Sequence, residues 1–286
     1  MPLLHVFGEL PAPAAVRRVF AAGAPAAMAL NSLTPQELVG WPSALPRQAQ
    51  QWLSPYSRSL PVVGRLAGRG STISSEQLLL LAPDVIVDMG DVNEHYLSMA
   101  RQFSAQVGIP YVLVSGRLHD SPEQLKTLGA LLGRREHGQY LADMAQEILD
   151  DIKARRKQHE GTLPSVYFAR SANGLETGVG ASIHSEVINL VGARSVASDL
   201  PGERLGQVSM EQLLLWNPDV IFTQEVAFYR QVYEHSQWRM LPAVQKKRVF
   251  LVPNVPFGWL DTPPALTVYW GQCGWRPGCI TKISHY

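Results

Sequence analysis

One segment of this 286-residue chain occurs twice, and this repeat constrains the fold more than any other feature. Residues 73–88 read ISSEQLLLLAPDVIVD and residues 208–223 read VSMEQLLLWNPDVIFT, with ten identities in sixteen aligned positions. The copies lie 135 residues apart, close to half the chain and far beyond a solenoid period. The repeat therefore predicts two lobes of related architecture. A chance match between two generic α/β segments is the less favoured interpretation.

Each copy of the repeat predicts a short helix followed by a buried strand. Ser74 and Ser209 are suited to cap a helix start. Pro83 and Pro218 are expected to end that helix, because proline cannot continue its hydrogen-bond ladder. The β-branched apolar run that follows is typical of a parallel strand covered on both faces.

The same alternation of strands and helices continues outside the repeat. Further strands are expected at residues 17–22, 38–40, 109–115, 165–170 and 248–253, and helices at residues 25–33, 94–106, 121–132 and 228–233. Ser121 is expected to cap its helix, residues 41–70 to form a loop, and a Gly-rich loop to precede a helix from about Ser182. Alternating elements of this kind argue for parallel sheets.

Residues 135–159 predict one long charged helix, better suited to a rigid connector than to an ordinary crossover. We therefore predict an α/β fold with two Rossmann-like lobes, each with a central parallel sheet, joined by a long rigid helix. The expected divisions are residues 1–120 for the N-terminal lobe, 121–160 for the connecting helices and 161–286 for the C-terminal lobe.

Composition and missing motifs exclude several classes of protein. Basic and acidic residues number 25 and 24, so nothing indicates a nucleic-acid partner. The sequence has no apolar run long enough to cross a membrane, and its first residues lack the features of a signal peptide. We expect either a mature chain or a cytosolic one. P-loop, dinucleotide and nucleophile-elbow motifs are missing, which leaves an α/β enzyme as a less supported alternative.

The order of these segments resembles class III substrate-binding proteins of ABC importers, the family for ferric siderophores, haem, cobalamin and some metals or oxyanions. The matching pieces are RVFAAG, ELVGWP, PVVG before the first repeat copy, the long helix, the VGA–VASD stretch, the second copy and PFGWLDTPP. Each piece alone is weakly specific, but together they cover nearly the whole chain in the expected order.

The resemblance implies a monomeric periplasmic binding protein without catalytic residues. Such a protein captures a small-molecule metal chelate between its lobes and delivers it to an ABC permease dimer in the inner membrane. The resemblance also implies that one surface glutamate per lobe docks onto permease arginines, and Glu76 and Glu211 match those positions. The alternative is that both acids only complete helix N-termini. A cytosolic ligand sensor on the same fold also stays open.

Ligand-binding residues in this kind of fold are expected at the carboxyl ends of the strands. The positions selected in this way are Trp41, Arg65, Arg69, Asp91, Arg170, Gln224, Phe257, Trp259 and Asp261. The arginines could hold carboxylates or an oxyanion, and the aromatic side chains could pack on a bulky chelate. Simple packing stays open for each aromatic residue.

The sequence leaves the ligand open. A ferric siderophore is the first expectation, with haem, cobalamin, a nickel chelate or molybdate and tungstate as alternatives. The sequence has no H-x-x-H spacing, so it does not indicate a set of metal ligands. Whether the protein itself coordinates a metal stays open.

The tail departs from the family pattern after Pro263 and Pro264, where a helix is expected and Gly, Pro, Cys273 and Cys279 occur instead. We hypothesise a frameshift near Leu266. Codons for VYWGQCGWRPGCITKISHY can be chosen so that a shifted frame reads LLGPMWLASRLHYQNQPL, which resembles the family's helix. Both cysteines would then be accidental, and the second lobe would lack packing helices, leaving the chain poorly stable or inactive.

Overall fold

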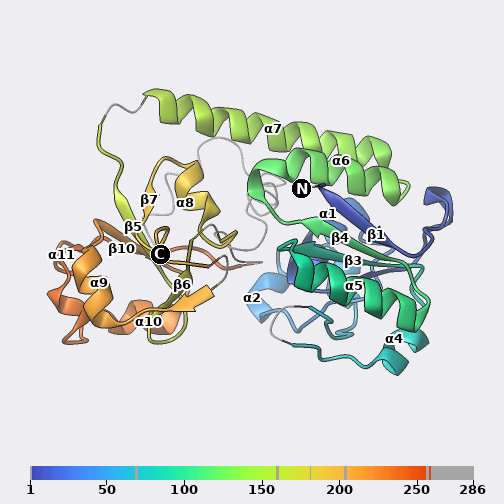
Figure 1. The fold of residues 1–286 in the computed structure, drawn as a ribbon, viewed down its shortest axis with the longest axis horizontal. Coiled ribbons are helices and arrows are strands. Elements are labelled where there is room, and N and C mark those ends of the chain that lie inside the picture. Colours follow the sequence, from blue (N-terminus) through green and yellow to red (C-terminus); the bar gives the residue numbers. More distant parts are fainter. Residues whose placement is uncertain are drawn as a thin grey trace. The chain divides into compact units, whose positions relative to one another are not determined.

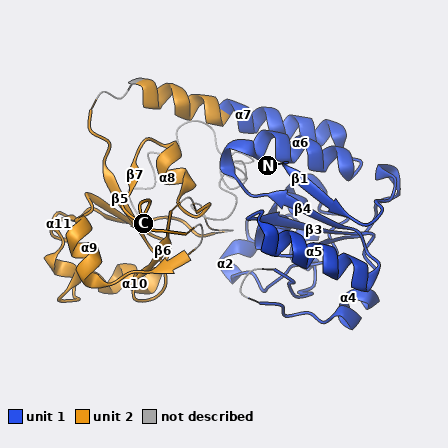
Figure 2. Ribbon diagram, in the orientation of Figure 1, with its two compact units in different colours: residues 1–147, 263–286 blue, residues 148–262 orange. Residues whose placement is uncertain are grey.

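The structure is a computed structural model that describes residues 2–67, 70–158, 161–180, 182–202, 205–255 and 258. The chain divides into two compact units, with the boundary between residues 147 and 148 (Figure 2). Each unit contains its own four-stranded sheet (Figure 1). The predicted α/β class, with a sheet in each half of the chain, is confirmed.

The sheet of the first unit has the strand order β1-β4-β3-β2. Its strands are β1 (Leu4–Phe7), β2 (Val19–Ala21), β3 (Val85–Gly90) and β4 (Tyr111–Ser115). The pairs β2–β3 and β3–β4 are parallel, as predicted. The edge strand β1, which the sequence did not predict, pairs antiparallel with β4. The predicted parallel centre of the sheet is therefore confirmed, with one antiparallel strand added at its edge.

Helices cover both faces of this first sheet. They are α1 (Ala24–Leu33), α4 (Ser75–Leu81), α5 (Glu94–Val107) and α6 (Ser121–Leu131). Helix α1 contacts β2, β3 and α6, and six of its seven buried residues are apolar. Helices α4 and α5 pack on the other face, where Phe20, Ile86 and Tyr111 join one apolar cluster with Leu78 and Ala100.

Three local expectations in this unit are wrong. Leu38 forms only a single bridge with Val19 in place of a strand over residues 38–40. The expected loop over residues 41–70 contains α2 (Arg47–Gln50) and α3 (Pro55–Ser59). The N-cap of α6 is Asp120 without a side-chain cap, and the Ser121 hydroxyl donates to Leu118 O at 2.6 Å instead.

Short 3₁₀ turns occur at Pro13–Ala15, Leu118–Asp120 and, in the second unit, Trp238–Met240.

The sheet of the second unit is parallel throughout, in the order β10-β9-β5-β7. Its strands are β5 (Ser165–Ala169), β7 (Arg194–Ser195), β9 (Val220–Thr223) and β10 (Val249–Leu251). A separate antiparallel pair joins β6 (Glu176–Gly178) and β8 (Leu205–Gln207). Strand β6 overlaps the predicted Gly-rich loop, and the helix expected from about Ser182 begins at Glu186.

The helices of the second unit are distributed unevenly over its sheet. They are α8 (Glu186–Leu190), α9 (Met210–Trp216), α10 (Val226–Gln231) and α11 (Pro242–Gln245). One face carries the large core cluster, which takes residues from α9, α10 and α11. The opposite face carries a smaller cluster of Val166, Phe168 and Ile188, with Val220 and Phe222 only partly buried.

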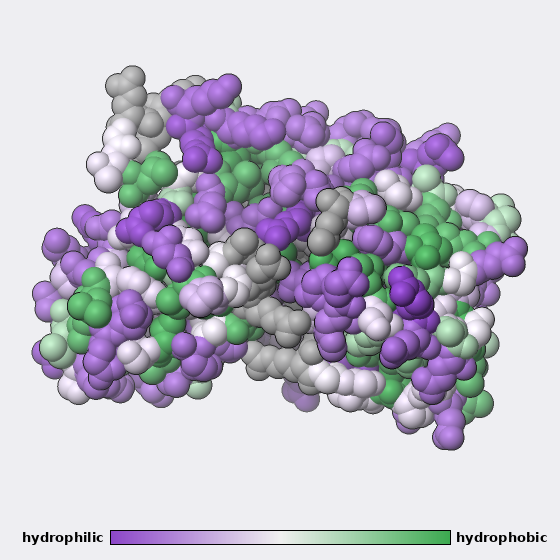
Figure 3. Space-filling view, in the orientation of Figure 1, coloured by the Kyte–Doolittle hydropathy of each residue, from purple (hydrophilic) through white to green (hydrophobic). Residues whose placement is uncertain are grey.

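Helix α7 (Arg135–Gln158) runs across the boundary between the units as one element of 24 residues, which confirms the predicted long helix. Glu136 lies in its first turn and Arg155, Arg156 and Lys157 in its last, as the helix dipole favours. Its visible outer surface is largely hydrophilic (Figure 3). Near its start, Gly138 approaches Gly129 of α6 so closely that a Cβ on either would clash.

The two copies of the repeat form the same local structure, as predicted. Ser74 and Ser209 are the N-caps of α4 and α9, and each hydroxyl accepts the backbone N–H three residues later at 3.1 Å. Leu78 and Leu213, at equivalent positions, are both fully buried. The repeat therefore places one helix and one strand of the same design in each unit.

The repeated aspartate ties each strand to its neighbour. Asp84 accepts the backbone N–H groups of Arg17 and Arg18 at 2.7 and 2.8 Å, at the start of β2. Asp219 accepts from the backbone N–H and the hydroxyl of Ser165 at 2.8 and 2.7 Å, at the start of β5. These hydrogen bonds lower the pKa of Asp219. The aspartate therefore has a structural function in both units.

Candidate functional site

Arg65 and Asp91 both start from the carboxyl edge of the first sheet, where the Arg65 guanidinium donates to Gly70 O at 3.1 Å. The backbone N–H groups of Leu66 and Ala67 donate to Ala22 O at 2.8 and 2.9 Å, which fixes the loop that carries Arg65 to the end of β2. Asp91 directly follows β3. Because β2 and β3 are adjacent and parallel, both side chains start from the same edge.

A close approach of two glycines fixes the neighbouring strand ends at this edge. Gly116 N donates to Gly90 O at 2.7 Å, where the chain leaves β4. A Cβ on Gly116 would lie 2.9 Å from Gly90 Cα, so no larger residue fits without a backbone shift. The sequence did not single out Gly116, although its place directly after a predicted strand was a usable signal.

Trp41 differs from the other residues selected in this unit because it is only 4% exposed. Its indole N–H donates to Ser57 O at 2.8 Å, and its backbone pairs with the segment around Val62. A ligand role for Trp41 stays a prediction, and its burial favours the packing alternative.

The carboxyl edge of the second sheet brings together Arg170 and Gln224. Strands β5 and β9 are adjacent and parallel, with Ala169 opposite Thr223, so the two following residues leave the sheet side by side. The guanidinium of Arg170 lies 5.5 Å from the centre of the Phe168 ring, and its backbone N–H donates to Glu176 O at 2.8 Å. Strand pairing therefore positions this arginine at its point of departure from β5.

Asn254 adds a third polar residue to this edge. It lies three residues after β10, and its side-chain amide donates to Gln224 O at 3.2 Å. The sequence did not select it, although it follows a predicted strand. The other four selected residues, Arg69, Phe257, Trp259 and Asp261, lie outside the described part of the chain.

A buried acid lies on β3, three residues before Asp91. Asp88 is 5% exposed, and its carboxylate accepts the Tyr111 hydroxyl and the Met89 N–H, each at 2.9 Å. Burial raises the pKa of Asp88, and the two hydrogen bonds oppose that rise only in part. Burial, together with the charge of Asp88, raises the pKa of Tyr111. Asp88 and Tyr111 therefore belong to the buried core of the first unit and not to the surface of its carboxyl edge.

The predicted docking glutamates lie at equivalent exposed positions of α4 and α9. Glu76 and Glu211 are each the second residue of a seven-residue helix. The backbone N–H of Glu211 and the side chain of Ser209 lower the pKa of the Glu211 carboxyl, so this carboxyl is charged at neutral pH. Each unit thus presents one acidic side chain on the same piece of structure.

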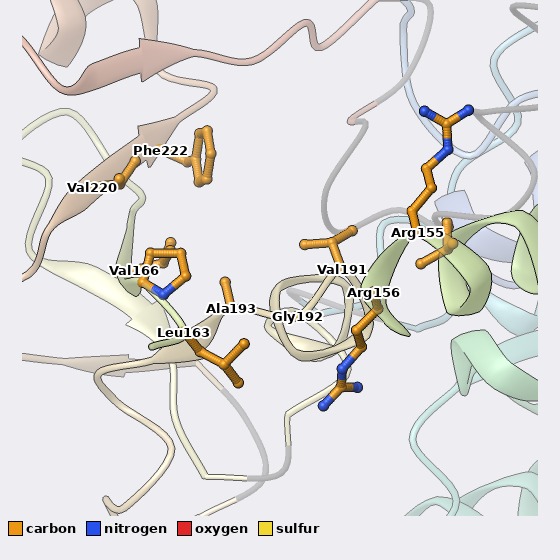
Figure 4. Close-up of a pocket in the computed structure, with 11 residues that line it drawn as sticks. Arg155, Arg156, Leu163, Val166, Val191, Gly192, Ala193, Val220 and Phe222 are labelled. Carbon is orange, nitrogen blue, oxygen red and sulfur yellow. The ribbon is translucent and has the colours of Figure 1, made fainter. Parts of the chain in front are cut away.

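A groove of about 450 Å³ lies within the second unit, on the sheet face that carries the smaller cluster (Figure 4). Val166, Val220 and Phe222 line it from the strands. Other lining side chains belong to the end of α7, the segment leading into β5, and the segment after α8: Ile152, Arg155, Arg156, Leu163, Pro164, Val191 and Ala193. The groove is apolar with a basic rim, and it includes none of the residues selected from the sequence.

The described part of the chain contains neither a cluster of metal-ligating side chains nor a membrane-spanning helix. No group of three His, Cys, Asp or Glu side chains among them is arranged to hold a metal ion. None of the helices in that part of the chain is long and apolar enough to cross a membrane.

Comparison with known proteins identifies the family. The profile described as periplasmic binding protein matches residues 31–256, well over half of the chain. The chain therefore belongs to the periplasmic binding protein family, a family of binding proteins rather than enzymes. The resemblance to substrate-binding proteins of ABC importers is confirmed by these matches.

Solved structures support the same assignment. An ABC transporter solute binding protein from Sulfurospirillum deleyianum is 30% identical, with a TM-score of 0.79, covering 90% of this chain and 82% of that one. A molybdate periplasmic binding protein of Haemophilus influenzae shares the fold at 20% identity, with a TM-score of 0.72, covering 93% and 86%.

Curated relatives include vitamin B12-binding proteins. The protein of Vibrio parahaemolyticus is 26% identical over 199 residues, 68% of each chain. That of Vibrio cholerae is 29% identical over 203 residues, covering 69% of this chain and 68% of that protein.

Proposed function

We propose that this protein captures a cobalamin-like metal chelate in the periplasm and delivers it to the permease of an ABC importer. The observation that carries the ligand class is the match to vitamin B12-binding proteins over two thirds of the chain. The ferric siderophore expected first from the sequence becomes the alternative, because both of these Vibrio relatives are vitamin B12-binding proteins.

The two carboxyl edges support recognition of a large polar chelate. Each edge combines one arginine with uncharged or acidic hydrogen-bonding groups: Arg65 with Asp91, and Arg170 with Gln224 and Asn254. A corrinoid offers amide and phosphate groups that match such donors and acceptors. Arginine pairs especially well with phosphate, because its planar fork donates two parallel hydrogen bonds. We propose that each edge is suited to bind polar groups of such a ligand.

Delivery to a permease is supported by the two repeated glutamates. Glu76 and Glu211 are exposed, lie in helices of identical design and belong to different units. Two carboxylates on rigid supports are suited to charge-assisted pairing with basic residues of a partner. We propose that each docks onto one subunit of a permease dimer.

Titration of the purified chain with cyanocobalamin, followed by calorimetry, tests the ligand. Arg65→Gln and Arg170→Gln should each weaken binding about tenfold or more, because each removes a charged hydrogen-bond donor. Arg101→Gln and Arg248→Gln are matched controls. Arg101 stacks on Phe7, which pairs with the first residue of β4. Arg248 directly precedes β10. Both arginines therefore lie at the amino ends of the parallel strands, away from the carboxyl edges. The controls should bind as the unchanged chain does.

The same titration with ferrichrome and with molybdate separates the alternatives. Binding of ferrichrome without cyanocobalamin would replace the corrinoid by a ferric chelate. Binding of molybdate alone would identify an oxyanion carrier. A chain that folds but binds none of the three would contradict the proposal.

A further inference from the structure

Leu80 of α4 and Leu215 of α9 occupy equivalent positions in the repeat, and both side chains stay exposed. Leu80 is 86% exposed and Leu215 is 81% exposed. They are 135 residues apart, the offset of the repeat itself. One exposed leucine is ordinary on a protein surface. Two leucines with matching exposure, at the same point of two copies, indicate a shared contact.

Each leucine lies next to a docking glutamate. Glu76 and Leu80 are separated by four residues on α4, and Glu211 and Leu215 by four residues on α9. Residues four apart lie on the same face of a helix, one turn from each other. Each unit therefore presents a surface with one carboxylate and one apolar side chain, which we name the Glu–Leu face.

The geometry of the two Glu–Leu faces is fixed by the same local devices. Both helices are capped by a serine at the N-terminus and end in a left-handed residue, Ala82 or Asn217, each with a φ of 43°. Leu78 and Leu213 anchor the inner side of each helix at full burial. The outward leucines are therefore held on supported helices, with little freedom to fold back into either core.

We propose that the two Glu–Leu faces bind two copies of one partner surface, each with a basic side chain beside an apolar recess. This inference rests on the proposed function and names the partner of the docking site: the two subunits of the ABC permease dimer. The carboxylate selects the cation, and the leucine fills the recess and excludes water from the ion pair. Because water is excluded, the attraction within this ion pair is stronger than within an ion pair exposed to solvent.

The test measures binding of the full chain to the permease of the same organism, held in lipid nanodiscs, with and without cyanocobalamin. Leu80→Ala and Leu215→Ala should each weaken binding about tenfold, and the double variant about a hundredfold, since distant sites add in free energy. Alanine preserves the helices. Tyr140→Ala and Met240→Ala remove large side chains that are 59% and 60% exposed, one in each unit. These controls should change binding less than twofold, and all four variants should keep their melting temperature.

The outcomes separate the inference from the function on which it rests. If Glu76→Gln and Glu211→Gln weaken binding while both leucine variants bind normally, the permease function stands and the leucine contact is wrong. If only one leucine variant weakens binding, the symmetric engagement is wrong. Equal losses in the controls would show nonspecific apolar adsorption and overturn the inference. A folded chain that never binds the permease would overturn the proposed function itself.

Discussion

The helix ends of the two repeat copies offer a paired test of how local backbone geometry contributes to stability. Ala82 has φ 43° and ψ 57°, and Asn217 has φ 43° and ψ 64°. The left-handed conformation costs most residues about 1–2 kcal/mol, whereas asparagine adopts it more readily. Ala82→Asn should therefore stabilise the chain by about 1 kcal/mol. Asn217→Ala should destabilise it by a similar amount.

Urea unfolding, followed by circular dichroism, measures both effects as shifts in midpoint at an unchanged slope. Ala105→Asn is the matched control, because Ala105 is exposed within the right-handed helix α5. There the same substitution should destabilise by about 0.5 kcal/mol through lower helix propensity. The reasoning is refuted if Ala82→Asn lowers the midpoint as the control does, or if the two reciprocal variants shift it in the same direction.

Three further predictions concern the buried acid, the repeated aspartate and the tail. Because burial raises the pKa of Asp88, the folded state favours its protonated form, and stability is lost as pH rises from the ordinary aspartate range through the raised pKa. The Asp88→Asn variant should therefore become more stable relative to the unchanged chain as the pH rises above the ordinary aspartate range, measured as melting temperature. The lowered pKa of Asp219 has the opposite effect on stability. The stability that its ionised carboxylate contributes is present above the unfolded-state pKa of about 3.9 and is lost as pH falls. Asp219→Asn should therefore cost up to about 1 kcal/mol near neutral pH and much less near pH 2, read from urea midpoints. Replacing residues 268–286 by LLGPMWLASRLHYQNQPL should raise the melting temperature and reduce binding of the dye ANS, since a helix would cover exposed apolar surface.

Elements with strong local signals could be predicted from the sequence. The repeat carries its own caps, its proline stop and its β-branched run, so α4, β3, α9 and β9 occur where expected. Strand β1 gave a weaker signal: it is four residues long, half-exposed, and depends on antiparallel pairing with β4, about a hundred residues away. Its position is decided by tertiary pairing, which local patterns do not encode.

The residues at the two carboxyl edges could be predicted from the sequence only where the end of the preceding strand could be predicted. Asp91, Arg170 and Gln224 directly follow their strands, so the parallel order of neighbours brings them to the edges. Trp41 also follows a predicted strand, yet it turns inward to Ser57 and is buried. Which way a side chain turns after a strand depends on the loop that packs against it, and that loop was expected to be irregular.

The two sheets differ in how their faces are covered, and this difference bears on the tail. In the first unit α1 covers one face, with α6 packed against it, and α4 and α5 cover the other. In the second unit the face with the groove leaves three apolar side chains open: Phe250 is 48% exposed, Val191 is 55% exposed and Leu163 is 40% exposed. A parallel sheet is stable when both faces are covered, so this face is suited to an apolar helix.

A charge placed in the groove distinguishes the two tails. Val191→Asp should cost little in the chain as written, because that side chain is already half-exposed. In the chain with the shifted-frame segment the same substitution should cost about 2 kcal/mol or more, because the charge would be buried beneath the new helix. Ala44→Asp, at an exposed position of the first unit outside its helices and strands, serves as the control in both chains. Equal sensitivity of the two chains to Val191→Asp would show that the shifted-frame segment does not bind this face, and the frameshift hypothesis would lose its structural support.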